Sequence, residues 1–272
     1  MNRRQFVACS LAAPILLGTT AEGDSPALDR VSGVLPPPGA LARGNRHRPG
    51  DPWGAFLGAL ALRPGGTPVK DYRGREMAIE PLRVVDMPLV PGDLQQCADS
   101  ILRLRATWMR QSGYDPAFRY TNGWKSAWSA WKAGDRPVLK DEKVEVRHTG
   151  VVDDSDSNFE KWMVDLFTYA GTISLKRDTV RVNEAGEFDH AAIEPGDVVM
   201  FAGSPGHAVL VLDVAWSREK IWVLVGQGFM PAMDFHLCPG PEGGWFHVGG
   251  EYLETSPLSV PWSGLRRFKG VE

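Results

Sequence analysis

The chain has 272 residues, of which 43% are hydrophobic and 23% charged, and these proportions are ordinary for a folded protein. The net charge is -3 and no long run of one sign occurs, which excludes the basic surface of a nucleic-acid-binding protein and a polybasic membrane anchor. Ten Trp, 30 Gly and 21 Pro indicate many turns between short elements.

The N-terminus has the pattern of an export signal. Arg3 and Arg4 precede an apolar stretch over residues 6–17, and small residues follow as far as Ala21. We therefore predict a signal peptide over residues 1–21 and a periplasmic or extracellular protein without a transmembrane segment. The paired arginines fit both a twin-arginine signal and an ordinary secretory signal.

The remainder of the chain divides into an arm and one domain. Residues 22–50 are rich in Pro, Gly and Arg and lack a sustained period, so we predict a flexible arm. Residues 51–272 are predicted to form a single domain. It begins with a short helix that is capped by Asp51, and a strand is predicted over residues 82–90.

The clearest helix is the segment "PGDLQQCADSILRLRATWMRQSG", residues 91–113. Asp93 can cap it, Gln96 can complete a capping box, and Gly113 ends it. The apolar residues recur at helical spacing and place Cys97 on the buried face, one turn from the start.

Some arginines and tryptophans in the first half of the chain could bind a ligand instead of serving only in packing. Arg103 and Arg105 could hold a substrate carboxylate, although pairing with acidic neighbours is favoured. Trp124 and Trp131 belong to a stripe at helical spacing, which favours the core but could form a ligand platform. The acidic run at residues 153–156, which begins the next predicted helix, lacks the glycine and distal glutamate of a calcium loop. No metal site is therefore predicted.

From residue 193 onward the pattern changes from helical to extended. The segments "DVVMF", "HAVLVLDVA", "IWVLVGQGF" and "WFHVGG" are predicted strands, and Gly, Pro and charged residues separate them. Since helices precede strands, we predict an α+β fold in which N-terminal helices pack on a small antiparallel sheet.

His207 begins an apolar strand and therefore needs a partner if it is buried. Asp213 points to the same side but lies about 20 Å away along the strand. If the chain reverses within "AWSREK", the hairpin places Gln227 opposite His207, at a β-carbon separation of about 5 Å. Asp234 and His236 are the alternative partners.

The nucleophile that such a histidine would serve is predicted to be Cys97, because the sequence lacks the motifs of serine, zinc and phosphate chemistry. The positive end of the helix dipole and a nearby imidazolium would lower its pKa and generate thiolate. Gln95, Gln96 or backbone N–H groups could bind an oxyanion. Two alternatives stay open, namely an inert buried thiol and a disulfide with Cys238.

The order of these motifs resembles the papain-like cell-wall amidases of the NlpC and CHAP type. The similarity runs from residue 93 to residue 227 and is carried by the cysteine at a helix start and by "PGDVVMF" and "GHAVLVLD". It implies a papain-like fold in which Cys97 is the nucleophile, His207 the base and Gln227 the residue that orients it. Those amidases usually have small polar residues beside the cysteine, where this chain has Gln96 and Ala98.

A second resemblance covers residues 50–250. The segments "DLQQCAD", "FTYAGT" and "QGFMPAMDFH" are similar to those of a bacterial exported family of unknown function.

We thus expect an exported cysteine amidase or peptidase without a cofactor. Its substrate would be a peptide or glycopeptide, with peptidoglycan as the candidate. The alternative is a non-catalytic envelope protein of the same fold that binds a glycan or peptide at Trp124 and Trp131.

Overall fold

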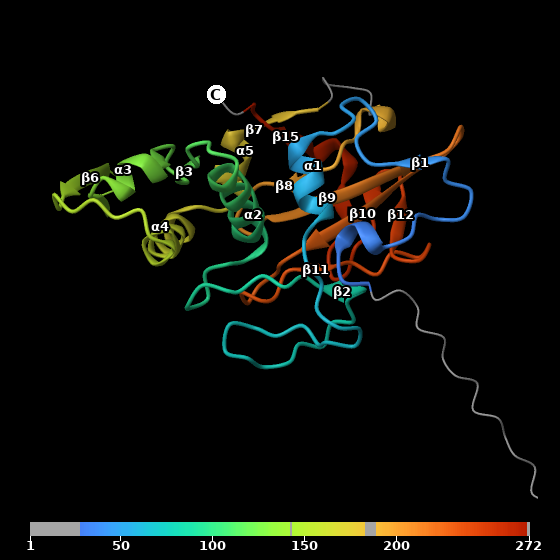
Figure 1. Ribbon diagram of the computed structural model, residues 1–272, viewed down its shortest axis with the longest axis horizontal. Helices are drawn as coiled ribbons and strands as arrows, with labels where there is room; N and C mark the ends of the chain where they lie inside the picture. The colour runs from blue at the N-terminus through green and yellow to red at the C-terminus, as the bar shows by residue number, and fades with distance from the viewer. Residues whose placement is uncertain (1–27, 142, 183–188, 271–272) are drawn as a thin grey trace, which may run out of the picture.

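The computed structural model describes residues 28–141, 143–182 and 189–270 (Figure 1). The predicted signal peptide lies outside these residues. The architecture is α+β, as the sequence predicts, with helices packed on an antiparallel sheet. The sheet is larger than the small one predicted, because short strands from the N-terminal half and from the C-terminus extend it. No helix within the described ranges is long and apolar enough to cross a membrane.

The sheet has nine strands, and every strand pair in it is antiparallel. β9 (His207–Trp216) and β10 (Ile221–Gln227) form the central hairpin, and the other two predicted strands are confirmed as β8 (Val198–Phe201) and β12 (Trp245–His247). Along the sheet the order is β2 (Arg83–Val84), β11 (His236–Leu237), β10 (Ile221–Gln227), β9 (His207–Trp216), β8 (Val198–Phe201), β15 (Leu265–Phe268) and β7 (Thr179–Arg181), while β1 (Ala42–Arg43) pairs with β9 and β12 (Trp245–His247) with β10.

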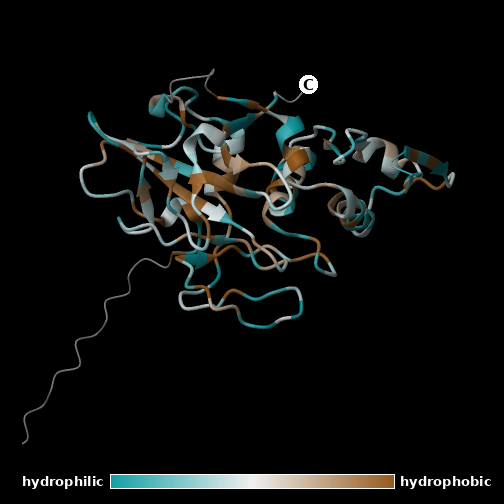
Figure 2. Ribbon diagram, turned by 180° about the vertical axis from the view of Figure 1, so that it is seen from behind, coloured by the Kyte–Doolittle hydropathy of each residue, from teal (hydrophilic) through white to brown (hydrophobic). Residues whose placement is uncertain are grey.

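The two faces of the sheet have different coverings. α1 (Pro52–Gly58) and α2 (Cys97–Gln111) both pack on β9. Side chains alternate along a strand, so Leu210 and Leu212 contribute to the helix-covered core, whereas Val209 and Val211 face a second apolar layer. The central strands are accordingly mostly brown in Figure 2.

The second layer comes from the C-terminal part of the chain. It includes the hairpin of β13 (Tyr252–Leu253) and β14 (Val260–Pro261), followed by the 3-10 helix η3 (Trp262–Gly264). Two other short 3-10 helices, η1 (Val31–Gly33) and η2 (His190–Ala192), connect elements elsewhere.

A smaller lobe extends from α2 away from the sheet in Figure 1. Trp162 and Phe159 of α4 (Asp156–Tyr169) pack there against Trp128. The other elements of this region are α3 (Trp128–Lys132), the hairpins β3 (Ala117–Arg119) with β4 (Lys125–Ala127) and β5 (Asp135–Lys140) with β6 (Lys143–His148), and α5 (Thr172–Asp178), which leads back to the sheet.

The prediction of a flexible arm is wrong for residues 28–50. Val31 is fully buried in the core beneath the helices, and β1 adds to the edge of β9. The Trp245 indole N–H donates to the carbonyl of Leu35 at 2.7 Å. Isolated apolar residues among Pro and Gly give no period, so the sequence pattern could not reveal that they fill the core.

Of the two helices on the sheet, α1 starts where the sequence predicts and α2 does not. Asp51 accepts a hydrogen bond from the Gly54 N–H at 3.0 Å and caps α1, as predicted. α2 begins later than predicted, at Cys97. Gln96 is its N-cap residue, and Asp99 accepts from the Gln96 N–H at 3.2 Å.

Candidate active site

His207 and Gln227 form the hydrogen bond that the sequence predicts. The His207 Nε2 and Gln227 Oε1 atoms are 2.8 Å apart, and both side chains are almost fully buried. Gln227 is fixed in turn, because its Nε2 donates to the carbonyl oxygen of Ser256 at 2.7 Å. The amide therefore joins the histidine to the layer on the far side of the sheet.

The route to this contact differs from the predicted register. A β-bulge follows Leu224, and Gly226 pairs with Leu210. Continuing that register places Gln227 across from Val209, so its side chain reaches His207 diagonally. The predicted partner is confirmed, and the predicted direct opposition is wrong because the chain turns later than predicted. The bulge moves Gln227 from opposite Leu210 to opposite Val209, which is on the same face of β9 as His207.

This pair of bonds determines which nitrogen of His207 carries the proton. The Gln227 NH₂ group faces a carbonyl, so its oxygen is the atom that faces the imidazole. Nε2 must then donate, and Nδ1 is left with a free lone pair in the neutral ring. Burial lowers the pKa of His207, which keeps the ring neutral near pH 7. Nδ1 of His207 is therefore the nitrogen that could accept a proton.

Cys97 lies next to this histidine along the backbone. It is the first residue of α2, and the backbone N–H of Ala208 points at its sulfur, together with the N–H groups of Ala98 and of Cys97 itself. Gly228 packs against the same turn, since a Cβ there would lie 3.1 Å from the carbonyl oxygen of Gln96. The thiol thus occupies the point where β10 ends and the start of α2 meets β9.

The predicted resting thiolate is not supported. Burial is the largest influence on Cys97 and, with the negative charge of Asp99, raises its pKa to about 11 despite the backbone N–H groups. The residue is 9% exposed. Within the described ranges no hydrogen bond joins it to His207, and neither Cys97 nor Cys238 forms a disulfide. The resting site therefore contains a neutral thiol and a neutral imidazole.

Asp99 is a buried carboxyl group that the sequence reading overlooked. Burial raises its pKa to about 8, against the lowering effect of the Gln96 N–H. Its Oδ1 atom and the hydroxyl of Ser100 are sealed from solvent and have no hydrogen-bond partner among the described residues. Its place three residues after the N-cap was a signal that could have identified it.

The glutamine side chains do not face the thiol as oxyanion donors. Gln95 accepts from the Val90 N–H at 3.3 Å and from Arg103 at 3.1 Å, so it holds the preceding loop to the helix. Gln96 donates to Asp93 at 3.2 Å. The groups that point toward the Cys97 sulfur are backbone N–H groups.

The alternative partners of His207 lie on the neighbouring strand and its approach. His236 pairs with Gln227 across β10 and β11 and is buried. Its Nδ1 lies 3.1 Å from the carbonyl oxygen of Asp234, whose carboxylate instead contacts Arg63 at 3.1 Å. Neither residue takes the place of Gln227.

The two tryptophans proposed as a ligand platform are used in packing. Trp131 is 8% exposed, donates to Asn158 at 3.0 Å and stacks with Arg136. Trp124 is partly buried against Tyr120. Both side chains are used in packing within the lobe around α3 and α4, which argues against a platform for flat ligands there.

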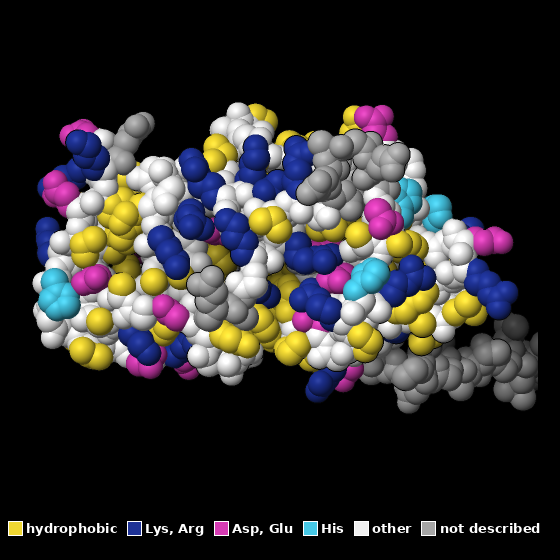
Figure 3. All heavy atoms as spheres, turned by 90° about the horizontal axis from the view of Figure 1, so that it is seen from above, with side chains coloured by type: hydrophobic (Ala, Val, Ile, Leu, Met, Phe, Trp, Pro, Cys, Tyr) yellow, Lys and Arg dark blue, Asp and Glu magenta, His cyan; other side chains and the backbone are white. Residues whose placement is uncertain are grey.

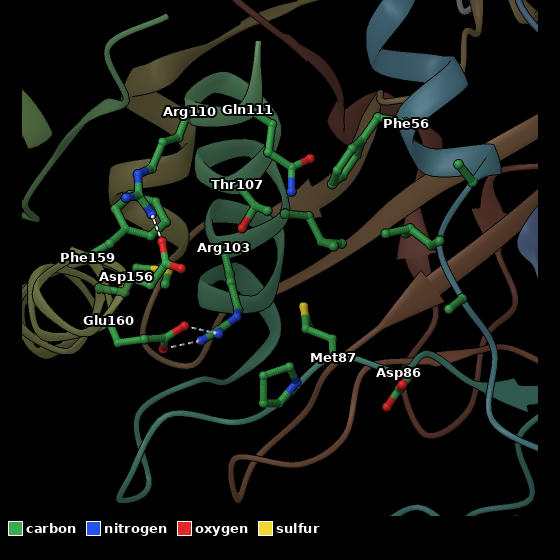
Figure 4. Close-up of a pocket in the computed structure, with 16 residues that line it drawn as sticks. Phe56, Asp86, Met87, Arg103, Thr107, Arg110, Gln111, Asp156, Phe159 and Glu160 are labelled. Carbon is green, nitrogen blue, oxygen red and sulfur yellow. Dashed lines mark hydrogen bonds and ion pairs between the residues drawn. The ribbon is translucent and has the colours of Figure 1, made fainter. Parts of the chain in front are cut away.

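A cavity of about 830 Å³ lies apart from the three candidate residues (Figure 4). It is bounded by α1, α2, α4 and the loop at residues 86–88. Arg103 points across it to Glu160, and Arg110 to Asp156. Cys97, His207 and Gln227 do not line it. No cluster that could hold a metal ion occurs among the residues that the structure describes.

The model of one protein family, described as a domain of unknown function (4846), matches residues 37–267. The chain belongs to this family. The match begins within the segment that was predicted to be an arm, in agreement with its packing in the fold. Neither the curated proteins nor the solved structures provide a match.

Proposed function

We propose that this member of the family is an exported cysteine hydrolase that cleaves peptide amide bonds. The observation that carries the proposal is the chain of bonds from Ser256 through Gln227 to His207, which leaves a basic nitrogen beside the residue whose N–H contacts the Cys97 sulfur. A buried amide oriented in this way serves a histidine that must keep one tautomer.

The proposed reaction starts from the neutral pair. As Cys97 Sγ attacks the carbonyl carbon of the substrate, His207 Nδ1 takes the thiol proton. The imidazolium then gives that proton to the departing amine as the C–N bond breaks, which leaves a thioester on Cys97. Water attacks the thioester, and one of its protons passes to Nδ1 and then to sulfur as the C–S bond breaks. The carboxylic acid product keeps the other proton and ionises in solution.

Opening of the closed site must precede this chemistry. His207 is buried and its ring meets Phe229 edge-on at 5.1 Å, directly after β10. Movement of the segment that contains Phe229 would admit substrate and bring the sulfur within reach of Nδ1. Backbone N–H groups at the start of α2 would then stabilise the oxyanion, because they carry the positive end of the helix dipole.

The substrate class follows from the proposed location and from the resemblance to papain-like NlpC and CHAP amidases. A cysteine hydrolase exported by a signal at residues 1–21 would meet peptide cross-links and stem peptides of the cell wall. We therefore propose peptidoglycan peptides as the substrate, and a papain-like arrangement of helix and sheet as the fold.

The test is hydrolysis of soluble peptidoglycan fragments, with products identified by mass spectrometry. The expected products are an amine and a carboxylic acid that together exceed the substrate by one water. Cys97→Ala is expected to abolish their formation. Cys238→Ala, a matched change of the other buried thiol, is expected to leave it intact. Hydrolysis that survives Cys97→Ala would overturn the proposal.

One observation favours a second function, a non-catalytic envelope protein of the same fold. The Cys97 thiol is buried and its pKa is raised, as in an inert core thiol. In that case the chain would bind peptidoglycan fragments without converting them, and Cys97→Ala would leave binding unchanged.

A further inference from the structure

A second cavity, of about 720 Å³, lies on the other side of α2 from the first. It is enclosed by the start of α1, the middle of α2 and the end of β15, and its volume is in the range of small-molecule sites. Its lining includes Trp53, Arg105, Trp108 and Phe268, and it does not include Cys97. Arg105 is eight residues beyond Cys97, or about 12 Å along the helix axis.

Arg105 is held in this cavity by aromatic rings. Its guanidinium carbon is 4.2 Å from the ring centroid of Trp108, 5.0 Å from that of Trp53 and 5.1 Å from that of Phe268. Such contacts stabilise a cation through its flat faces and leave the N–H groups at its edge free to donate.

The edge of Arg105 has no acceptor among the described residues. The side chain is 6% exposed, yet it has no hydrogen bond or ion pair there. A polar atom without a hydrogen-bond partner is either sealed in the protein or accessible, and the Arg105 nitrogens are not among the sealed ones. They therefore face the open space of the cavity. Arg103, two residues earlier, donates instead to both carboxylate oxygens of Glu160.

The charge of Arg105 persists at neutral pH. Burial lowers its pKa to about 10, and the negative charge of Asp51 is the largest influence that opposes this shift. A buried cation without a direct acceptor is costly unless something else supplies one.

The other cations around the cavity already have acceptors. Arg48 pairs with Glu194 at 2.5 Å, and Arg267 pairs with Asp197 at 2.6 Å. Lys269 donates to a backbone carbonyl at 3.0 Å. Seen from above, Lys and Arg side chains gather over this side of the molecule, where β7 and β15 lie (Figure 3). The cavity is lined by four cationic and three acidic residues, so one positive charge is unmatched. The cationic residues are Arg48, Arg105, Arg267 and Lys269, and the acidic residues are Asp51, Glu194 and Asp197.

We propose that the cavity around Arg105 binds the carboxylate of a small organic monoanion. The guanidinium edge matches a carboxylate with two parallel N–H donors, and one unmatched charge suits a monoanion better than a dianion. The aromatic walls of Trp53, Trp108 and Tyr114 favour an organic body over a bare inorganic ion. This site is separate from the proposed hydrolysis at Cys97.

The test is calorimetric titration of the full chain with benzoate, benzamide and inorganic phosphate. Benzoate is expected to bind in the millimolar range or tighter, while benzamide, its uncharged counterpart, is expected not to bind. Arg105→Met is expected to weaken benzoate binding at least about tenfold. Arg105→Lys keeps the charge but lacks the planar pair of N–H donors. Its affinity for benzoate is therefore expected to lie between those of Arg105→Met and the unmodified chain.

Two controls separate this site from folding and from hydrolysis. Arg103→Met alters a neighbouring arginine of the same helix and is expected to leave benzoate binding unchanged, as is Cys97→Ala. Thermal unfolding would show that the Arg105 variants are folded. Absence of benzoate binding, equal binding by Arg105→Met, or binding of phosphate alone would overturn the proposal.

Discussion

The two cysteines of the described chain are both buried, yet their surroundings differ. Cys97 begins α2 and has three backbone N–H groups directed at its sulfur, whereas Cys238 follows β11 among the apolar residues of the second layer. Burial alone raises the pKa of Cys238 to about 12, while that of Cys97 is raised to about 11. Only Cys97 has a polar environment that could stabilise a negative charge during a reaction.

The comparison shows that a helix start is insufficient to ionise a thiol. The N–H groups around Cys97 lower its pKa, but burial and Asp99 outweigh them in the closed structure. The proposed reaction therefore needs a base that takes the proton during attack, and His207, whose tautomer is fixed by Gln227, is the residue that we propose for that role.

Among the variants that test the difference between the two cysteines, His207→Ala is expected to have the largest effect. Without the base, hydrolysis should fall by at least about a hundredfold, since the neutral thiol would lose its proton acceptor. The measurement is kcat on peptidoglycan fragments, with Cys238→Ala as the unchanged reference. Full activity in His207→Ala would remove the distinction between the two cysteines.

A smaller effect is expected from Gln227→Ala. Loss of one hydrogen bond of about 1.4 kcal/mol should lower kcat about tenfold, because His207 is no longer held in one tautomer. Gln227→Glu restores an acceptor for Nε2 and should recover part of the rate and shift its pH profile toward higher pH, since a carboxylate favours the imidazolium. A Gln227→Ala enzyme with the original rate and pH profile would contradict the orienting role.

A third effect, on stability rather than on rate, is expected from Asp99→Asn. The folded-state pKa of Asp99 is raised to about 8, above an unfolded value of about 3.9, so the folded state binds this proton more tightly. Its contribution to stability is therefore full below pH 4 and is lost as pH rises toward 8, by a few kcal/mol at most. Urea unfolding between pH 4 and 8 should show a flatter pH dependence for Asp99→Asn, and an identical dependence would contradict the raised pKa.

Asp99→Asn also bears on the cysteines directly. Because Asp99 contributes to the raised pKa of Cys97, the variant should alkylate at Cys97 with a lower apparent pKa, while Cys238 should be unaffected.

The sequence predicted the central strands and the His207–Gln227 contact because alternation and a lone polar residue in an apolar strand are local signals. It could not predict the β-bulge after Leu224, since a shift of one residue has no signature in the pattern. The carbonyl of Ser256 and the N–H of Ala208 were also inaccessible, because backbone groups are the same in every residue and only the fold brings them to the site.

The most direct test of the role of Cys97 is stepwise alkylation with iodoacetamide at pH 9, with the modified cysteine located by mass spectrometry and hydrolysis measured on the same samples. We predict that Cys97 reacts before Cys238 and that activity falls in proportion to the fraction of Cys97 modified. Full activity in a sample whose Cys97 is completely alkylated would contradict the account.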